Sequence, residues 1–338
     1  MRKSLLALAL ASALVALPHA AQAATGTEID QSAKALSIAV LADTPYGNAQ
    51  RAVFPAMIDS VNNDPKVRVV IHLGDLKNGS TSCSNEYLGF VVEQLARLQD
   101  PLVYTPGDNE WTDCHRLNNG PFDPLERLDW IRTTLFPQPG TTLGGRPKSV
   151  FTQAHEPGFE TFVENVLWFE SRVAFSAVHV VGSNNSKAAW TNEQPSDTER
   201  RKAERLARTE AAIAWIDRTF DLAGEQGAAG VVIAMQADMW DAFSVNNHLP
   251  LDGFTSIAQR LADRARAFGR PVLLLQGDSH GYLVDNPLAG ADPVHHIAHP
   301  VPNLTRIVAP GATATQWLRL NVDPAKPEVF TWEAVNVQ

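Results

Sequence analysis

Short apolar runs alternate with amphipathic segments along the first third of the chain. The runs at residues 35–41, 67–73 and 102–105 predict buried strands. Between them, apolar residues recur every three or four positions at residues 53–61 and 87–98, which predicts two helices. The order strand, helix, strand, helix, strand is typical of a parallel sheet with right-handed crossovers, so the pattern predicts an α/β fold.

The rest of the chain divides into a loop-rich region and a second set of strands. Residues 111–160 are rich in proline, glycine and polar side chains, which predicts an insertion able to form the wall of a pocket. After this insertion we expect paired strands at 163–170 and 173–181, a helix at 197–222, a strand at 230–235, a helix at 256–268 and a strand at 271–276. Three further strands, near 305–309, 316–322 and 328–334, are short, and we expect antiparallel pairing for them.

The N-terminus carries the pattern of an exported protein. Arg2 and Lys3 precede an apolar stretch from Leu5 to Leu17, and Ala21-Gln22-Ala23 forms a small-residue cleavage site. The stretch is too short to cross a bilayer, so residues 1–23 are predicted to be a cleavable signal peptide rather than a membrane anchor. A buried N-terminal helix is the alternative. We therefore expect a periplasmic or secreted protein with a leader at 24–34 and a single domain at 35–338.

Composition and charge narrow the class of protein further. The chain has 338 residues, 44% of them hydrophobic, and a formal net charge of −9, so it has the composition of a globular protein and lacks the basic surface that duplex nucleic acid requires. Cys83 and Cys114 are its two cysteines. In an oxidising compartment they are expected to form a disulfide, with two separate buried thiols as the alternative.

Polar side chains follow five of the predicted strands. The five strand ends read Ala42-Asp43-Thr44-Pro45, Gly74-Asp75-Leu76-Lys77-Asn78, Gly107-Asp108-Asn109-Glu110, Gln236-Ala237-Asp238 and Gly277-Asp278-Ser279-His280. A single Gly-Asp pair is an ordinary turn, but the carboxyl ends of parallel strands meet at one edge of a sheet. Carboxylates gathered there repel one another unless cations hold them together. The sequence therefore predicts a metal site, with room for more than one ion.

The order and spacing of these segments resemble the motifs of the calcineurin-like metallophosphoesterases, which include the purple acid phosphatases. The family pattern is an aspartate after the first strand, Gly-Asp-x-x-(Asp/Asn/Tyr), Gly-Asn-His-(Asp/Glu), a lone histidine after a later strand, and Gly-His-x-His. The resemblance covers nearly all of the chain after residue 23 and implies a four-layer α/β/β/α sandwich with a dinuclear metal centre. It also implies hydrolysis of a small phosphorylated substrate, in which a metal-held hydroxide attacks phosphorus.

The resemblance also implies a role for individual residues. Carried over by position, Asp75 bridges two ions. The first ion is then held by Asp43 and His280, and the second by Asp108, Gln236 and Asp278. Asp75, Asn109 and His280 are the residues expected to take part in the reaction, and Asn78 and Glu110 are expected to support the ligands through hydrogen bonds.

Several positions depart from the family pattern. Asp108 stands in place of asparagine, and histidines are replaced at Asn109, Gln236 and Asp278; Pro45 also stands where many members have a histidine. These losses favour an alternative function, a non-catalytic domain that binds a metal or a phosphorylated ligand. They also favour Mn²⁺, Mg²⁺ or Ca²⁺ on the oxygen-rich side, whereas the His280 side also suits iron or zinc.

Two other patterns compete with this interpretation. Residues 277–281 match the G-x-S-x-G pattern of serine hydrolases, and Asp285 and His295 follow Ser279 in the required order. The residues after Gly281 are expected to form a loop rather than the helix that this motif opens, so the serine hydrolase is the less favoured alternative. His295, His296 and His299 resemble a metal-binding tract, but a loop of solvated histidines is the favoured interpretation.

Overall fold

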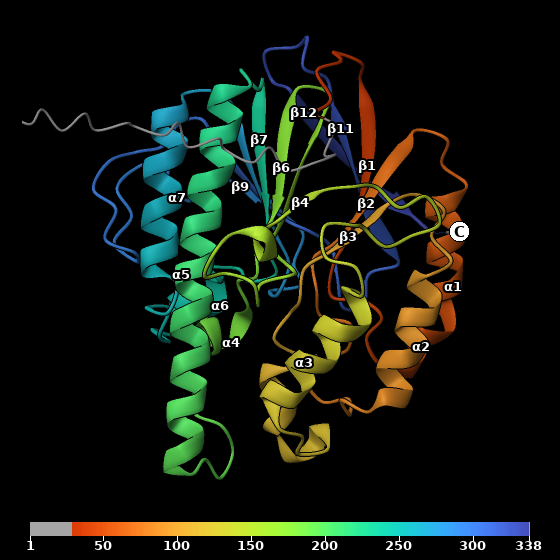
Figure 1. Ribbon diagram of the computed structural model, residues 1–338, viewed down its shortest axis with the longest axis vertical. Coiled ribbons are helices and arrows are strands. Elements are labelled where there is room, and N and C mark those ends of the chain that lie inside the picture. The colour runs from red at the N-terminus through yellow and green to blue at the C-terminus, as the bar shows by residue number, and fades with distance from the viewer. Residues whose placement is uncertain (1–28, 338) are drawn as a thin grey trace, which may run out of the picture.

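The computed structural model describes residues 29–337, so the predicted signal peptide lies outside the described residues. Two mixed sheets pack face to face (Figure 1). The five-stranded sheet has the order β12-β11-β1-β2-β3 and consists of β1 (Leu36–Leu41), β2 (Val67–His72), β3 (Leu102–Tyr104), β11 (Gln316–Val322) and β12 (Phe330–Asn336). The seven-stranded sheet has the order β4-β5-β6-β7-β8-β10-β9 and consists of β4 (Phe151–Thr152), β5 (Val166–Glu170), β6 (Val173–Ala177), β7 (Gly230–Ala234), β8 (Val272–Gln276), β9 (Leu283–Asp285) and β10 (Leu304–Val308).

Helices cover the outer face of each sheet. The five-stranded sheet is covered by α1 (Gly47–Asn62), α2 (Asn85–Leu95) and α3 (Pro124–Leu135). The seven-stranded sheet is covered by α5 (Pro195–Glu225) and α7 (Thr255–Phe268). Two short helices, α4 (Gly182–Ser186) and α6 (Ala242–Asn246), follow strands. The result is the predicted four-layer α/β/β/α sandwich.

The first apolar runs do not alternate between polar and apolar residues, because both faces of these strands are buried. In β1, Ile38 and Val40 face the core between the two sheets, whereas Ala39 and Leu41 face the core beneath the helices. Successive side chains of a strand point to opposite faces, so a strand between two cores needs apolar residues at every position. This arrangement fixes β1, β2 and β3 as parallel neighbours.

Two features differ from the sequence-based expectations. The 111–160 region contains a helix, α3, whose residues Leu128, Ile131 and Leu135 pack into the core of the first sheet. The expected antiparallel pairing holds for β11 and β12 but only in part for β10, which pairs antiparallel with the short strand β9 and in parallel with β8. The connection through residues 277–303 is long enough for a parallel crossover, so strand length alone did not determine direction.

None of the helices in residues 29–337 combines the length and the apolar character needed to span a membrane.

Candidate metal centre

The carboxyl ends of parallel strands from both sheets meet at one place. Asp43 follows β1, Asp75 follows β2, and Asp278 and His280 follow β8. All four have a left-handed backbone, with φ of 49° at Asp43, 57° at Asp75, 71° at Asp278 and 63° at His280. This conformation costs free energy in residues other than glycine, and it accumulates at functional sites. The turn after each strand thus directs a polar side chain into the same space.

Glycines allow the Asp75 and Asp108 loops to touch. A Cβ atom at Gly107 would lie 2.1 Å from Asp75 Oδ1, and one at Gly74 would lie 2.4 Å from the Gly107 nitrogen. No residue with a side chain fits at either position without moving a loop. The glycine of each Gly-Asp pair therefore brings the two carboxylates together.

The side chains form two overlapping groups with the spacing of metal ligands. Asp43, Asp75 and His280 each offer a ligand atom within 4.8 Å of the other two, and so do Asp75, Asp108 and Asp278. Asp75 belongs to both groups. The two groups contain the residues of the two ligand sets that the family resemblance implied, apart from Gln236, and Asp75 is the residue that they share.

The electrostatics of the two groups fit bound cations. Burial raises the pKa of the Asp43 carboxyl to about 7. Burial, together with repulsion from neighbouring carboxylates, raises the pKa values of Asp75 and Asp278 well above their usual range. The buried Asp43 Oδ2 has no hydrogen-bond partner among the described residues. Divalent cations would neutralise this charge and occupy the free oxygen, so the residues present fit a metal centre.

Tyr46 lies at the centre of the site, and the sequence motifs did not identify it. Its hydroxyl donates to Asp75 Oδ2 at 2.7 Å and lies 3.3 Å from both Asp43 Oδ1 and His280 Nε2. Burial and the nearby carboxylates raise the pKa of this phenol well above its usual value, so it remains a proton donor at neutral pH. Tyr46 follows Pro45, and the only sequence clue was its position three residues after Asp43.

Asn109 contacts the shared carboxylate of Asp75 directly, whereas His280 lies near Asp43. The Asn109 side chain donates to Asp75 Oδ2 at 2.6 Å, and its backbone N–H donates to Asp75 Oδ1 at 3.2 Å. His280 Nε2 lies 3.9 Å from Asp43 Oδ1, and 45% of its side chain is exposed. Burial lowers the pKa of His280, which favours the neutral form that metals require.

Gln236 is placed differently from the expected ligand role. Its carboxamide oxygen accepts a 2.6 Å hydrogen bond from the Gly182 N–H, and its nitrogen donates to Asp108 Oδ1 at 3.2 Å. Because the backbone N–H fixes which end of the amide is oxygen, Gln236 presents nitrogen to Asp108. The residue thus orients the Asp108 carboxylate through its nitrogen, while its oxygen is already engaged by the Gly182 N–H.

The two residues expected to support the ligands behave differently. Glu110 is fully buried, and its Oε1 accepts hydrogen bonds from Tyr104 Oη and from the N–H groups of Gly107 and Asp75. It therefore holds both ligand loops in place. The Asn78 side chain accepts hydrogen bonds from Ser80 and Thr81 instead, so it stabilises its own turn.

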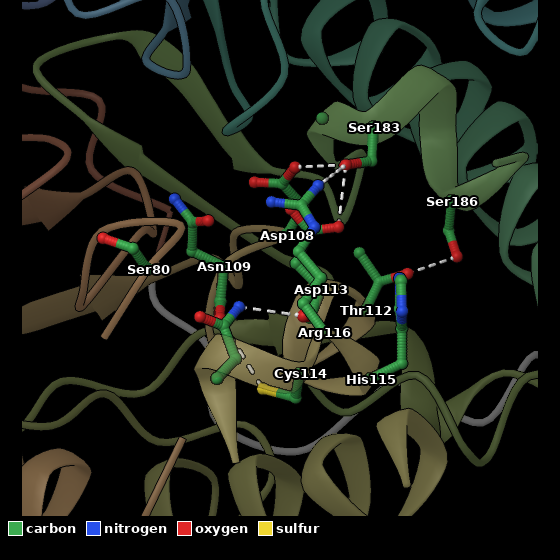
Figure 2. Close-up of polar contacts among 12 residues, drawn as sticks. Ser80, Asp108, Asn109, Thr112, Asp113, Cys114, His115, Arg116, Ser183 and Ser186 are labelled. Carbon is green, nitrogen blue, oxygen red and sulfur yellow. Dashed lines mark hydrogen bonds and ion pairs between the residues drawn. The ribbon is translucent and has the colours of Figure 1, made fainter. Parts of the chain in front are cut away.

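Ser183 and Asp113 extend the site beyond the sequence motifs. The Ser183 hydroxyl lies between Asp108 Oδ2, at 2.8 Å, and Asp113 Oδ1, at 2.9 Å, as Figure 2 shows. Residues Ser183 to Ser186 all have positive φ, so the chain after Gly182 makes a left-handed turn that points Ser183 at Asp108. The segment Ser183-Asn184-Asn185 thus reaches the centre, while Asn185 is buried against Arg208.

The predicted disulfide between Cys83 and Cys114 is present and buried. It joins the segments that follow Asp75 and Asp108, and the two sulfurs lie 3.5 and 3.6 Å from the Asn109 carbonyl oxygen. The cross-link closes a loop over a sequence separation of 31. It therefore restrains the loop that carries Asp108 and Asn109.

The competing motifs do not assemble a second site in residues 29–337. The Ser279 hydroxyl donates to Asp238 Oδ2 at 2.7 Å, whereas His295 Nε2 lies 2.8 Å from the Met239 carbonyl, so no serine–histidine pair forms. The expectation of a solvated histidine loop holds for His296 and His299 but is wrong for the buried His295. His295 is buried because its ring packs against Trp240.

Comparisons with known proteins agree with the motif assignment. Residues 36–205, half of the chain, match the model of the calcineurin-like phosphoesterases. Among solved structures, the chain is similar to GAP50 of Plasmodium, the anchor in the inner membrane complex, at 10% identity, TM-score 0.44, and coverage of 90% of this chain and 89% of that one. It is also similar to the purple acid phosphatase PPD1 from yellow lupin seeds, at 10% identity, TM-score 0.46, and coverage of 90% and 54%. No curated protein matches it in sequence. On the family match and the motif order, the chain belongs to the calcineurin-like phosphoesterase family.

Proposed function

We propose that the protein is an exported, metal-dependent phosphoesterase that hydrolyses a small phosphate ester at a dinuclear centre. The observation that carries the proposal is the pair of ligand groups that share Asp75, one with Asp43 and His280 and the other with Asp108 and Asp278. The N-terminal sequence and the buried disulfide support export, since disulfides persist in oxidising compartments.

The chain's own residues prepare the site for this reaction. Asp43, Asp75, Asp108, Asp278 and His280 would hold the ions. When bound, the two ions supply positive charge that activates water and stabilises the phosphoryl group during its transfer. Tyr46 and Asn109 hold Asp75 Oδ2 through hydrogen bonds of 2.7 and 2.6 Å. The partly exposed His280 would hold one ion as a neutral imidazole, on the side of the Asp43 group that is open to solvent.

A non-catalytic metal- or phospho-ligand-binding domain is the second candidate. Asn109 stands where many family members have a histidine that assists the reaction, and a carboxamide cannot transfer protons near neutral pH. Tyr46, whose hydroxyl donates to Asp75 Oδ2 at 2.7 Å, is a proton donor near Asp75 that could take this part.

Metal analysis coupled to hydrolysis assays distinguishes the two functions. The purified protein is loaded with Mn²⁺, Mg²⁺, Ca²⁺, Zn²⁺ or iron and assayed with p-nitrophenyl phosphate and bis(p-nitrophenyl) phosphate. We expect two divalent ions per chain and turnover of at least one ester. Bound metal without turnover under any condition would support the binding domain, and failure to bind any metal would contradict both the phosphoesterase and a metal-binding domain.

The two ions are expected to differ in strength of binding. The Asp75–Asp108–Asp278 group has only oxygen ligands, whereas the other group includes the imidazole of His280. Oxygen ligands favour hard cations, and imidazole adds affinity for zinc and iron. Dialysis against a chelator should therefore remove the ion of the all-oxygen group first, and Mn²⁺ or Ca²⁺ should restore it better than Zn²⁺. Titrations that find two tightly held zinc ions per chain would contradict this ligand assignment.

A further inference from the structure

Arg116 lies at the edge of the metal centre with part of its guanidinium free. It joins two short helical segments, Thr112–His115 and Leu117–Asn119. Its Nη2 forms a 2.6 Å ion pair with Asp113 Oδ2 and lies 3.5 Å from the Ser183 hydroxyl. No hydrogen bond joins its Nη1 or Nε to any residue in 29–337, and 41% of its side chain is exposed. The guanidinium is thus held at one end and open at the other.

The open end faces a space beside the Asn109 side chain, which in turn contacts the shared carboxylate of Asp75. A Cβ atom at Gly79 would lie 3.3 Å from Arg116 Nη1 and 3.2 Å from Asn109 Oδ1, so these two groups border the same small volume. The same Asn109 side chain donates to Asp75 Oδ2 at 2.6 Å. On its other side, Arg116 reaches Asp108 through Ser183, as Figure 2 shows. Arg116 is thus one side chain removed from Asp75, through Asn109, and from Asp108, through Ser183, so its guanidinium could reach a group bound over these two carboxylates.

The free guanidinium is an accessible positive charge in a space surrounded by carboxyl groups. The neighbouring side chains include the carboxyls of Asp75, Asp108 and Asp113, which would repel an anionic substrate. Lys77 is also close to these carboxyls, but it is fully buried and its Nζ donates to the Asn78 carbonyl at 3.0 Å. Arg116 is accessible, and a guanidinium presents paired N–H groups that match phosphoryl oxygens.

We propose that Arg116 binds a terminal oxygen of the substrate's phosphoryl group and makes the site selective for phosphomonoesters. The inference rests on the proposed phosphoesterase function and names its substrate class. A phosphomonoester carries three terminal oxygens and close to two negative charges at neutral pH. A diester has two terminal oxygens and one charge. A site that adds a guanidinium to two cations provides a partner for the additional oxygen, which a diester lacks.

The surroundings of Arg116 hold the guanidinium in place before substrate binds. The Asp113 backbone N–H donates to the Asp108 carbonyl at 3.0 Å, and its carboxylate binds both Arg116 and Ser183. The adjacent Cys114 is fixed by the disulfide. An arginine restrained in this way loses little conformational entropy when an anion binds.

The test compares Arg116→Ala and Arg116→Lys with Arg200→Ala in the metal-loaded, full-length protein. Arg200 is a matched control, because it has a similarly exposed side chain, at 45%, and a 2.8 Å ion pair with Asp123. Metal content, the inhibition constant of inorganic phosphate, and kcat/KM for p-nitrophenyl phosphate and bis(p-nitrophenyl) phosphate are measured for each variant.

We expect Arg116→Ala to weaken phosphate binding and to lower kcat/KM for the monoester by about 10- to 100-fold. This is the effect expected when a hydrogen bond to a charged group is lost. Metal content should not change, diester hydrolysis should fall less than about threefold, and Arg116→Lys should recover part of the loss, since its ammonium keeps the charge without the paired donors. Arg200→Ala should behave as wild type.

Equal losses for monoester and diester, or unchanged phosphate binding in Arg116→Ala, would overturn the inference. A wrong assignment of Arg116 can be told apart from a wrong assignment of the phosphoesterase function, because phosphate binding can be measured without turnover. If the wild-type protein hydrolyses neither ester, calorimetric titration of the metal-loaded protein with phosphate still compares wild type with Arg116→Ala. Wild-type protein that binds no phosphate would overturn the role of Arg116 as well.

Discussion

Replacement of Asp75 by alanine is expected to remove at least one ion per chain and to reduce any hydrolysis by more than about 100-fold. Loss of a residue that merely supports a ligand costs about 10- to 100-fold in affinity or activity, so loss of a shared ligand should cost more. Asp75 belongs to both ligand groups, and its two oxygens also organise Tyr46 and Asn109. No other described residue takes part in both groups.

Asp75→Asn shows whether the loss comes from the site or from unfolding. In the metal-free protein, burial and repulsion raise the pKa of Asp75 far above its usual value, so the fold favours the uncharged carboxyl. When folding raises the pKa of a carboxyl, the free energy of unfolding decreases as the pH rises from the pKa of that group in the unfolded chain to its pKa in the folded protein. At pH 7 the neutral asparagine variant, without metal, should therefore be at least as stable as metal-free wild type. Denaturant unfolding measures this directly.

Ser279→Ala provides the matched comparison for activity. Ser279 adjoins the ligand Asp278, but its hydroxyl donates to Asp238, so its removal should leave metal content and hydrolysis close to wild type. If instead Asp75→Ala retains both metal and activity while Ser279→Ala is inactive, a serine hydrolase is the correct interpretation.

The sequence predicted the strand ends well because two physical constraints coincide there. Strands covered on both faces are apolar at most positions, which makes β1, β2 and β8 easy to recognise. The residues that end neighbouring parallel strands meet at one edge, which is why Asp43 and Asp75 could be placed together without knowledge of their contacts. Asp278 follows β8 of the other sheet, so its place beside them depends on how the two sheets pack.

Residues outside this rule were missed for specific reasons. Tyr46 reaches the site through its long side chain, and Ser183 reaches it through a left-handed turn, which its sequence of polar residues does not specify. Helix α3 was hidden among prolines and glycines, although Asp123 followed by Pro124 is a recognisable helix start, and the Asp123 side chain caps the helix. Gln236 was placed at the correct strand end, but only the Gly182 contact shows which way its amide points.

A buried ionic network joins helix α3 to the seven-stranded sheet. Glu164 precedes β5 and is fully buried, and it forms a 2.6 Å ion pair with Arg132 of α3 and a 2.8 Å hydrogen bond with His179 Nδ1. Burial alone would raise the pKa of Glu164, but Arg132 and His179 outweigh it and hold this pKa well below its usual range. The carboxylate is thus charged in the folded protein at all pH values near neutral.

Glu164→Gln is expected to lower the free energy of unfolding by about 3 kcal/mol at pH 7. Removing one member of a buried ion pair costs about 3–5 kcal/mol because the other charge is left buried, and the partial exposure of Arg132 places this case at the lower end. Glu199→Gln is the matched control: Glu199 is exposed and pairs with Lys202 at 3.3 Å, so its loss should cost less than about 1 kcal/mol.

The same variant should show a characteristic dependence on pH. Because the folded pKa of Glu164 is depressed, its stabilisation is complete above the unfolded pKa of about 4.3 and is lost as the pH falls through the folded pKa. The difference in unfolding free energy between wild type and Glu164→Gln should therefore stay constant from pH 7 to about 5 and shrink below about pH 4. Urea unfolding at a series of pH values measures it. A Glu164→Gln protein as stable as Glu199→Gln at pH 7, or a difference that grows towards acid pH, would show that this network does not hold α3 to the sheet.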